Sequence, residues 1–218
     1  GSGNDAQYLV ANALSKNIEH NKCEFVVGLG DNIYETGCED INDKQFIEKF
    51  ELPYIKIPDK VKFYMCIGNH DYGSYIDRMF DNNYKYQIKY GLASQKNDMK
   101  WYMPHNYYAF NKTKGNVSID FFVIDTNIHL MSKTLRKQQM YDIKKLISKS
   151  NADWKILIGH HTFRSVAGHG NAEHKLERYL LKLFDKGIHL YLCGHDHNKQ
   201  LIEYTGKKYN MICVVCGA

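Results

Sequence analysis

Four short polar clusters of the sequence combine side chains that bind metal ions, and each cluster begins with a glycine that follows a hydrophobic run. The clusters are Gly30–Tyr34 (GDNIY), Gly68–Asp71 (GNHD), Gly159–His161 (GHH) and Gly194–Asn198 (GHDHN). Carboxylate, phenol and amide oxygens are hard donors, and imidazole nitrogens are borderline donors. Because this mixture suits a pair of metal ions, the clusters predict a two-metal site.

The hydrophobic runs before the clusters must position them. Each run is short and hydrophobic, and Phe25–Leu29 also contains β-branched residues, so each is predicted to be a buried strand. The runs are Phe25–Leu29, Val61–Ile67, Trp154–Ile158 and Ile188–Cys193. Open α/β sheets place their ligand chemistry just beyond the carboxyl ends of the strands. Parallel strands would therefore bring all four clusters to one edge.

Each candidate residue alone also has an ordinary structural explanation. Asp31 follows a glycine, as turn residues often do, and Asn69 could cap a helix. Tyr34 is one of 17 tyrosines, most of which would serve packing. His195 and His197 can reach one edge only if the chain leaves its strand between them. The metal interpretation therefore rests on the four clusters occurring together.

The remaining elements are predicted from apolar spacing and from turn residues. Helices are expected over residues 5–16, 40–50, 133–149 and 173–186, and the Tyr-rich segment 73–91 is expected to be partly helical. Two hairpins are expected, one with arms 101–110 and 117–124 and one with arms 201–204 and 209–215. This alternation indicates a layered α/β fold with helices covering sheets, and residues 1–218 are expected to form a single domain.

Composition excludes some classes of protein. A hydrophobic content of 44% argues against global disorder. The formal charge of +5 is modest and mildly favours anionic substrates, and without a dense basic block no nucleic-acid partner is predicted. The six cysteines define no disulfide framework, and Cys213–Cys216 lacks a second pair at zinc-site spacing. No transmembrane run or signal peptide occurs within residues 1–218, and because the chain is expected to be cut at its start, this absence decides little.

Two glycosylation sequons, at Asn111 and Asn116, occupy one polar loop. They favour a glycoprotein of a secretory compartment.

The clusters together resemble the purple (tartrate-resistant) acid phosphatases, a group within the calcineurin-like metallophosphoesterases. Ser165–Gly170 (SVAGHG) and Ile124–Asp125–Thr126 also match that group, so the resemblance covers nearly the whole chain. The tyrosine three residues after Asp31 distinguishes this group from the protein phosphatases. The resemblance implies the α/β/β/α sandwich of the metallo-dependent phosphatases.

The resemblance also implies a role for each matched residue. Asp31 would bridge two metals, and Tyr34 and His197 would bind Fe(III). Asn69, His160 and His195 would bind a second, divalent metal, which could be Fe, Zn or Mn. His70 and His169 would be the catalytic residues that contact phosphate and protonate the leaving alkoxide. Asp125 and Asp196 are interpreted as groups that orient imidazoles.

The sequence departs from the family pattern in three places. Family members begin with a strand that ends in Asp-x-Gly, and nothing before Gly1 supplies it, so the chain is expected to be cut there and slightly shortened after Ala218. His161–Thr162 stands where Tyr-Pro or Phe-Pro is usual. The cysteine pair that bridges loops in mammalian members is not matched.

The function expected from these observations is that of a dinuclear acid phosphatase. It would hydrolyse phosphomonoesters through attack by a metal-activated hydroxide, as a monomer in a secreted, vacuolar or lysosomal location. Two alternatives remain. One is a non-catalytic scaffold that retains the fold, and the other is a calcineurin-like nucleotide or phosphodiester hydrolase. The sequence does not name the physiological substrate.

Overall fold

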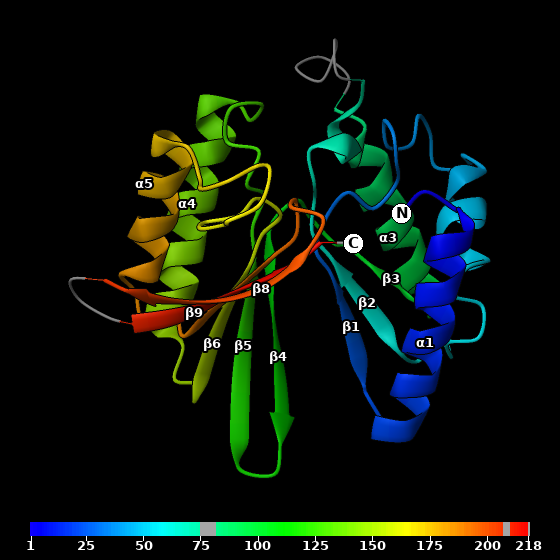
Figure 1. Ribbon diagram of the computed structural model, residues 1–218, viewed down its shortest axis with the longest axis horizontal. Coiled ribbons are helices and arrows are strands. Elements are labelled where there is room, and N and C mark those ends of the chain that lie inside the picture. Colours follow the sequence, from blue (N-terminus) through cyan, green and yellow to red (C-terminus); the bar gives the residue numbers. More distant parts are fainter. Residues whose placement is uncertain (75–81, 207–209, 218) are drawn as a thin grey trace. The chain divides into compact units, whose positions relative to one another are not determined.

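The structure is a computed structural model that describes residues 1–74, 82–206 and 210–217. Its internal contacts divide the chain into two units. Unit 1 comprises Gly1–Met65 and Asn69–Asn106, and unit 2 comprises Cys66–Gly68 and Tyr107–Ala218 (Figure 1). The expectation of a single domain stays a prediction.

Unit 1 contains a three-stranded parallel sheet. The strands lie in the order β1 (Phe25–Gly28), β2 (Lys62–Met65) and β3 (Trp101–Tyr102). Its helices are α1 (Asp5–Asn21), the π-helix η1 (Ile47–Glu51), the 3-10 helix η2 (His70–Tyr72) and α3 (Tyr84–Lys96). The segment 73–91 is helical from Tyr84, and residues 75–81 within it lie outside the described residues.

Aromatic side chains fill the core of unit 1. The ring of Phe50, on η1, meets Trp101 edge-to-face at 4.8 Å and Phe63 at 5.2 Å between ring centroids. Edge-to-face pairs stabilise beyond the area that they bury. These contacts hold η1 against strands β2 and β3.

Unit 2 contains a six-stranded mixed sheet with the order β4-β5-β6-β7-β9-β8. Strands β5, β6, β7 and β9 are parallel, and both edge strands, β4 and β8, pair antiparallel. The strands are β4 (Tyr108–Lys114), β5 (Val117–Val123), β6 (Trp154–Ile158), β7 (Leu190–Cys193), β8 (Lys199–Thr205) and β9 (Asn210–Cys216).

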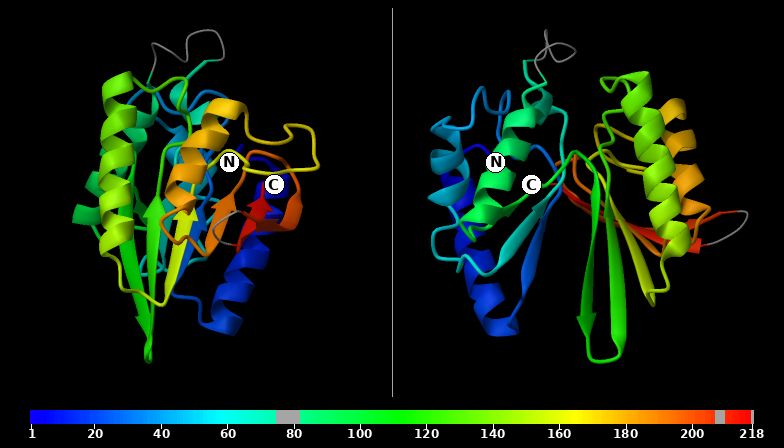
Figure 2. Two further views of the ribbon diagram at one scale, coloured as in Figure 1. Left: turned by 90° about the vertical axis from the view of Figure 1, so that its left-hand side faces the viewer. Right: turned by 180° about the vertical axis from the view of Figure 1, so that it is seen from behind.

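Helices α4 (Lys133–Lys149) and α5 (His174–Phe184) lie side by side along one face of this sheet (Figures 1 and 2). Their apolar faces, including Ile143, Leu180 and Leu183, join one buried cluster with Leu157 and Tyr191 of the strands. The apolar spacing that predicts these two helices is therefore the spacing of their contacts with the sheet.

The α/β fold class is confirmed, and the strands before the four polar clusters form within a few residues of their predicted bounds. The helix predicted over residues 40–50 is wrong in its first part. Asp43 accepts the backbone N–H groups of Glu39 and Gln45, at 3.0 Å each, and so fixes a turn there. Such local side-chain bonds compete with helix formation.

The predicted hairpin forms, but its first arm, predicted over residues 101–110, begins only at Tyr108. Residues Trp101–Tyr102 pair in parallel with β2 in unit 1, whereas Tyr108–Lys114 pair antiparallel with β5 in unit 2. Trp101 is fully buried in the aromatic core of unit 1, which separates it from the hairpin. Within the described ranges, no helix is both long enough and apolar enough to cross a membrane.

Candidate metal centre

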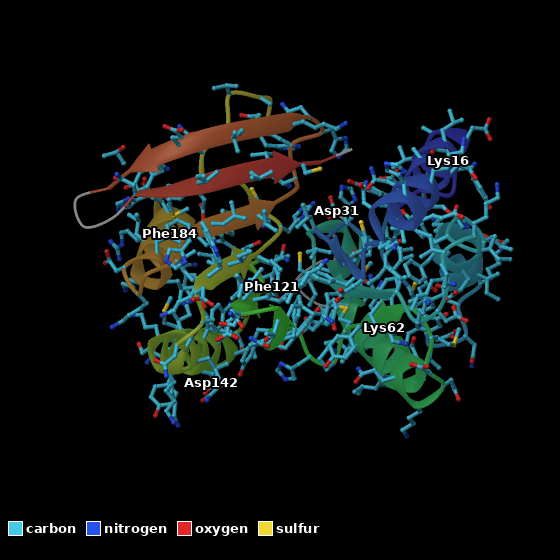
Figure 3. All side chains as sticks on the ribbon, turned by 90° about the horizontal axis from the view of Figure 1, so that it is seen from below. Lys16, Asp31, Lys62, Phe121, Asp142 and Phe184 are labelled. Atoms are coloured by element: carbon cyan, nitrogen blue, oxygen red, sulfur yellow. The ribbon has the colours of Figure 1, made fainter. Side chains whose placement is uncertain are left out.

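Asp31 lies just beyond the end of β1, where the chain turns sharply. Gly30 and Asp31 have φ values of 87° and 51°, so both lie in the left-handed region and end the strand. The Tyr34 hydroxyl donates to Asp31 Oδ2 at 2.9 Å, and the backbone N–H of His70 donates to Asp31 Oδ1 at 3.0 Å. The buried carboxylate of Asp31 (Figure 3) therefore links the first two polar clusters of the sequence within unit 1.

A second buried carboxylate holds the loop that carries Asp31. Asp71, which is fully buried, accepts the backbone N–H groups of Asn32 at 2.9 Å and Ile33 at 3.2 Å. Gln87 of α3 donates to Asp71 at 2.8 Å and accepts from the Asn32 amide at 3.0 Å. Fully satisfied buried networks of this kind rigidify their surroundings. The position of the loop is therefore set by residues from three separate segments.

Tyr34 is a candidate metal ligand, and the protonation state of its phenol depends on whether a cation lies beside it. Burial and then the neighbouring Asp31 carboxylate raise the pKa of the Tyr34 phenol well above its usual value. The phenol hydroxyl keeps its proton and donates a hydrogen bond to Asp31. A nearby metal ion supplies the charge that phenolate ligation requires.

Asn69 and His70 lie at the start of η2, within the same unit. The His70 ring nitrogen Nδ1 lies 2.7 Å from the carbonyl oxygen of Glu35. Because a carbonyl oxygen can only accept, Nδ1 is the donor in this contact, and Nε2 is the ring nitrogen left for other contacts. The His70 ring also packs on Tyr34, with centroids 4.5 Å apart.

In unit 2, His160 and His195 follow the parallel strands β6 and β7. His195 has a φ of 68°, so the chain leaves the direction of β7 at this residue. His195 Nδ1 lies 3.1 Å from His160 Nε2. The structure thus brings these two predicted ligands together. His197 lies two residues further on and is exposed.

The loop that carries His169 is anchored to Asp196. The backbone N–H of His169 donates to Asp196 at 2.8 Å, and the Ser165 hydroxyl donates to the other carboxylate oxygen. Burial alone would raise the pKa of Asp196, but these two hydrogen bonds hold it below its usual value. The His169 ring packs against the His195 ring, with centroids 4.1 Å apart and the ring planes tilted by 32°. Asp196 therefore places a predicted catalytic residue beside a predicted ligand.

Some residues around the candidate centre were not found by sequence reasoning. The Thr126 hydroxyl oxygen accepts the backbone N–H of His161 at 3.0 Å and lies 2.7 Å from its Nδ1, and the Tyr191 hydroxyl donates to the His161 carbonyl at 2.7 Å. Gln87 of α3 also lacked a predicted role, because it belongs to none of the polar clusters or matched motifs. Asp125 accepts the backbone N–H of Asn127 at 2.9 Å, so it stabilises its own turn.

The donor spacings fit metal ligation. Two ligands about 2.1 Å from one ion, at right angles to each other, lie about 3 Å apart. The spacing from Tyr34 to Asp31 is 2.9 Å, and that from His160 to His195 is 3.1 Å. Each unit therefore presents a pair of donor atoms that one cation could bind. The oxygen pair suits a hard ion such as Fe(III), and the nitrogen pair suits a borderline ion such as Fe(II) or Zn.

An α/β fold with Asp, Asn and His clusters after its strands is typical of a metallophosphoesterase. The chain belongs to the calcineurin-like phosphoesterase family, which it matches over residues 4–199.

Among individual proteins, the chain is 30% identical to human tartrate-resistant acid phosphatase type 5 over 88% of the chain and 61% of that protein. It is 27% identical to purple acid phosphatase 7 of Arabidopsis thaliana over 92% of the chain and 62% of that protein. The chain thus spans about three fifths of the length of these relatives.

A solved structure described as GAP50, the anchor in the inner membrane complex of Plasmodium, is also similar. It aligns with a TM-score of 0.79 and 25% identity, over 98% of the chain and 67% of that structure. The recognition of the purple acid phosphatase group from the sequence is confirmed by these relatives.

Proposed function

We propose that this protein is an acid phosphatase that hydrolyses phosphomonoesters at a dinuclear centre of Fe(III) and a divalent metal. The observation that carries the proposal is the pair of donor spacings near 3 Å, one in each unit. In this proposal Asp31, Tyr34 and His197 hold the ferric ion. Asp31, Asn69, His160 and His195 hold the divalent ion.

The metals, when bound, would neutralise the charge of the phosphate and acidify water. The chain's own histidines would supply the remaining chemistry. His70 has Nδ1 committed to the Glu35 carbonyl, so its Nε2 is the atom for phosphate or for the leaving alcohol. His169 is held through its backbone by Asp196, which leaves its ring to protonate the alkoxide.

The test uses the purified protein reconstituted with iron and zinc. A visible phenolate-to-iron band and hydrolysis of an aryl phosphate at acidic pH are expected. Tyr34→Phe should remove the band, whereas Tyr8→Phe, at an exposed position of α1, should not. If neither the native protein nor Tyr8→Phe binds iron, and neither hydrolyses an aryl phosphate, the proposal is contradicted.

A scaffold function is the second candidate, and the similarity to the GAP50 anchor favours it. Metal analysis separates the two candidates. Stoichiometric iron together with aryl phosphate hydrolysis supports the enzyme, and protein that folds without metal or activity supports the scaffold.

The substrate class needs its own test, because a phosphodiester or nucleotide hydrolase would share the metal chemistry. We propose the monoester because Tyr34 and His169 belong to the purple acid phosphatase pattern. Phosphomonoesters should turn over faster than diesters that carry the same leaving group.

We further propose a monomer in a secreted, vacuolar or lysosomal location. The sequons lie on the β4–β5 hairpin, where both Asn111 and Asn116 are exposed. Glycan removal from the native protein with an amidase should lower its mass if the location is right. An unchanged mass would count against it.

A further inference from the structure

The positive charge of the protein is concentrated on two neighbouring helices. Helix α4 has six basic residues and one acidic residue, and α5 has three basic residues and one acidic residue. The two helices therefore carry a formal charge of +7 in a chain of +5, and the rest of the chain is net negative.

These cations point outward. The buried residues of α4 are Gln139, Ile143 and Ile147, which form its inner stripe. The five lysines of α4 lie outside this stripe, and all except the half-buried Lys144 are exposed. They are Lys133, Lys137, Lys144, Lys145 and Lys149. On α5, Lys175, Arg178 and Lys182 are exposed in the same way. We call these eight side chains the α4–α5 face.

The cations of this face are not neutralised by the protein. In the described ranges of the chain, none of the eight forms an ion pair within 4.0 Å of a carboxylate. Other cations are paired: Lys62 lies 2.6 Å from Asp98, and Lys100 lies 2.8 Å from Asp59. Uncompensated like charges repel one another, so a face of this kind gains most from an external anion.

We propose that the α4–α5 face binds the anionic surface of a lipid bilayer. Helix α4 has 17 residues and is about 25 Å long, so its lysines meet negative charge along an extended line rather than at one point. Clusters of several lysines on a helix bind anionic lipid headgroups. The protein would then lie on the membrane through this face, in addition to its proposed phosphatase activity.

Two exposed hydrophobic side chains of α4 favour a bilayer over other polyanions. Tyr141 is 62% exposed, and Leu146 is 43% exposed. Tyr141 lies at helical spacing between Lys137 and Lys145, and the Lys145 ammonium lies 5.8 Å from its ring centroid. Aromatic groups flanked by lysines suit the boundary between headgroups and acyl chains.

The kind of cation points the same way. Seven of the eight cations are lysines, and only Arg178 offers the bidentate fork that grips a nucleic-acid phosphate or a base edge. Lysine acts as a mobile point charge, which suits the fluid headgroups of a bilayer.

The test measures co-sedimentation of the whole protein with vesicles of phosphatidylcholine, and with vesicles of phosphatidylcholine and phosphatidylserine in equal amounts. Binding is expected only to the second kind, and added salt should weaken it because salt screens charge. The quadruple variant Lys137→Gln, Lys144→Gln, Lys145→Gln and Lys149→Gln should bind at least about tenfold more weakly. Glutamine has nearly the helix propensity of lysine, so the fold of α4 should be retained.

A second quadruple variant controls for net charge. It replaces Lys16 of α1 and Lys85, Lys89 and Lys96 of α3, all exposed in unit 1, by glutamine (Lys16 is labelled in Figure 3). Both variants lose the same charge, and the control should bind vesicles like the native protein. Equal weakening by both variants, or no binding of the native protein to phosphatidylserine, would overturn the proposal. Tighter binding to duplex DNA than to vesicles, lost in the α4 variant, would assign the face to nucleic acid and also overturn it.

Discussion

The carboxylate of Asp71 lies 2.9 Å from the backbone nitrogen of Asn32, and through this bond the second polar cluster holds the loop of the first. Both residues are buried. Asp71→Ala should destabilise the protein by about 3 kcal/mol, because it leaves the buried N–H groups of Asn32 and Ile33 without their acceptor. Urea denaturation measures the loss.

The control is Glu48→Ala, which also removes one carboxylate. Glu48 is half exposed and lies 3.9 Å from Lys44, an arrangement that contributes less than about 1 kcal/mol. Equal losses for the two variants would contradict the structural role of Asp71.

Removal of His195 should weaken binding of the divalent metal. His195 and His160 present nitrogens 3.1 Å apart, and His195→Ala leaves one of them. Loss of an outer partner of a metal ligand typically lowers the metal affinity about 10- to 100-fold, and loss of the ligand His195 itself should lower it by more. Chelator competition followed by metal analysis measures it. His20→Ala, at an exposed position near the end of α1, should leave the affinity unchanged.

Asp196 should make stability depend on pH at the acidic end. The hydrogen bonds to Asp196 lower its pKa from the ordinary value of 3.8. A lowered pKa contributes stability that is fully present above pH 3.8 and is lost as the pH falls through the folded-state pKa. The difference in free energy of unfolding between the native protein and Asp196→Asn should therefore shrink with acidification below that pH.

Ser165→Ala tests the cause of this pH dependence. It removes the hydroxyl donor to Asp196 and keeps the carboxylate. The loss of stability in acid should then be smaller than in the native protein and complete at a higher pH, because the folded-state pKa of Asp196 lies closer to 3.8. A difference between native protein and Asp196→Asn that stays constant across the acidic range would contradict the assignment.

Gly91→Ala should destabilise unit 1, although alanine is the better helix former by about 1 kcal/mol. A Cβ at Gly91 would lie 2.7 Å from the carbonyl oxygen and 2.9 Å from the nitrogen of Met103, and backbone atoms cannot move aside easily. A net loss of about 2 kcal/mol is expected in urea denaturation. At Gly168 a Cβ has no neighbour within 4 Å, so Gly168→Ala should change stability little.

Elements with a strong apolar period could be predicted closely from the sequence. Helix α4 and strand β6 have their predicted bounds, because Ile143, Ile147 and Leu157 belong to the buried cluster of unit 2 and Ile156 and Ile158 are also buried. The prediction failed where a local polar contact or a distant partner decided the structure. Hydrogen bonds to Asp43 form a turn where the first turns of a helix were predicted. Packing against Phe50 holds Trp101 in the sheet of unit 1.

The candidate site shows the same division. The Asp, Tyr, Asn and His donors could be found because their residue types follow strands at regular places. Gln87 could not be found, because a glutamine on a helix looks like a surface residue until its fully buried amide meets Asp71 and Asn32. The α4–α5 face could not be found either, because lysines distant in sequence become neighbours only when two helices pack together.

The bonds among Asn32, Asp71 and Gln87 also constrain how unit 1 opens. Amide hydrogens of Asn32 and Ile33 can exchange with solvent only when Asp71 releases them, and Gln87 ties Asp71 to α3. The metal-binding loop and helix α3, whose Gln87 lies 55 residues beyond Asn32, should therefore open together as one cooperative unit. Hydrogen exchange at the loop would then report the local stability of α3.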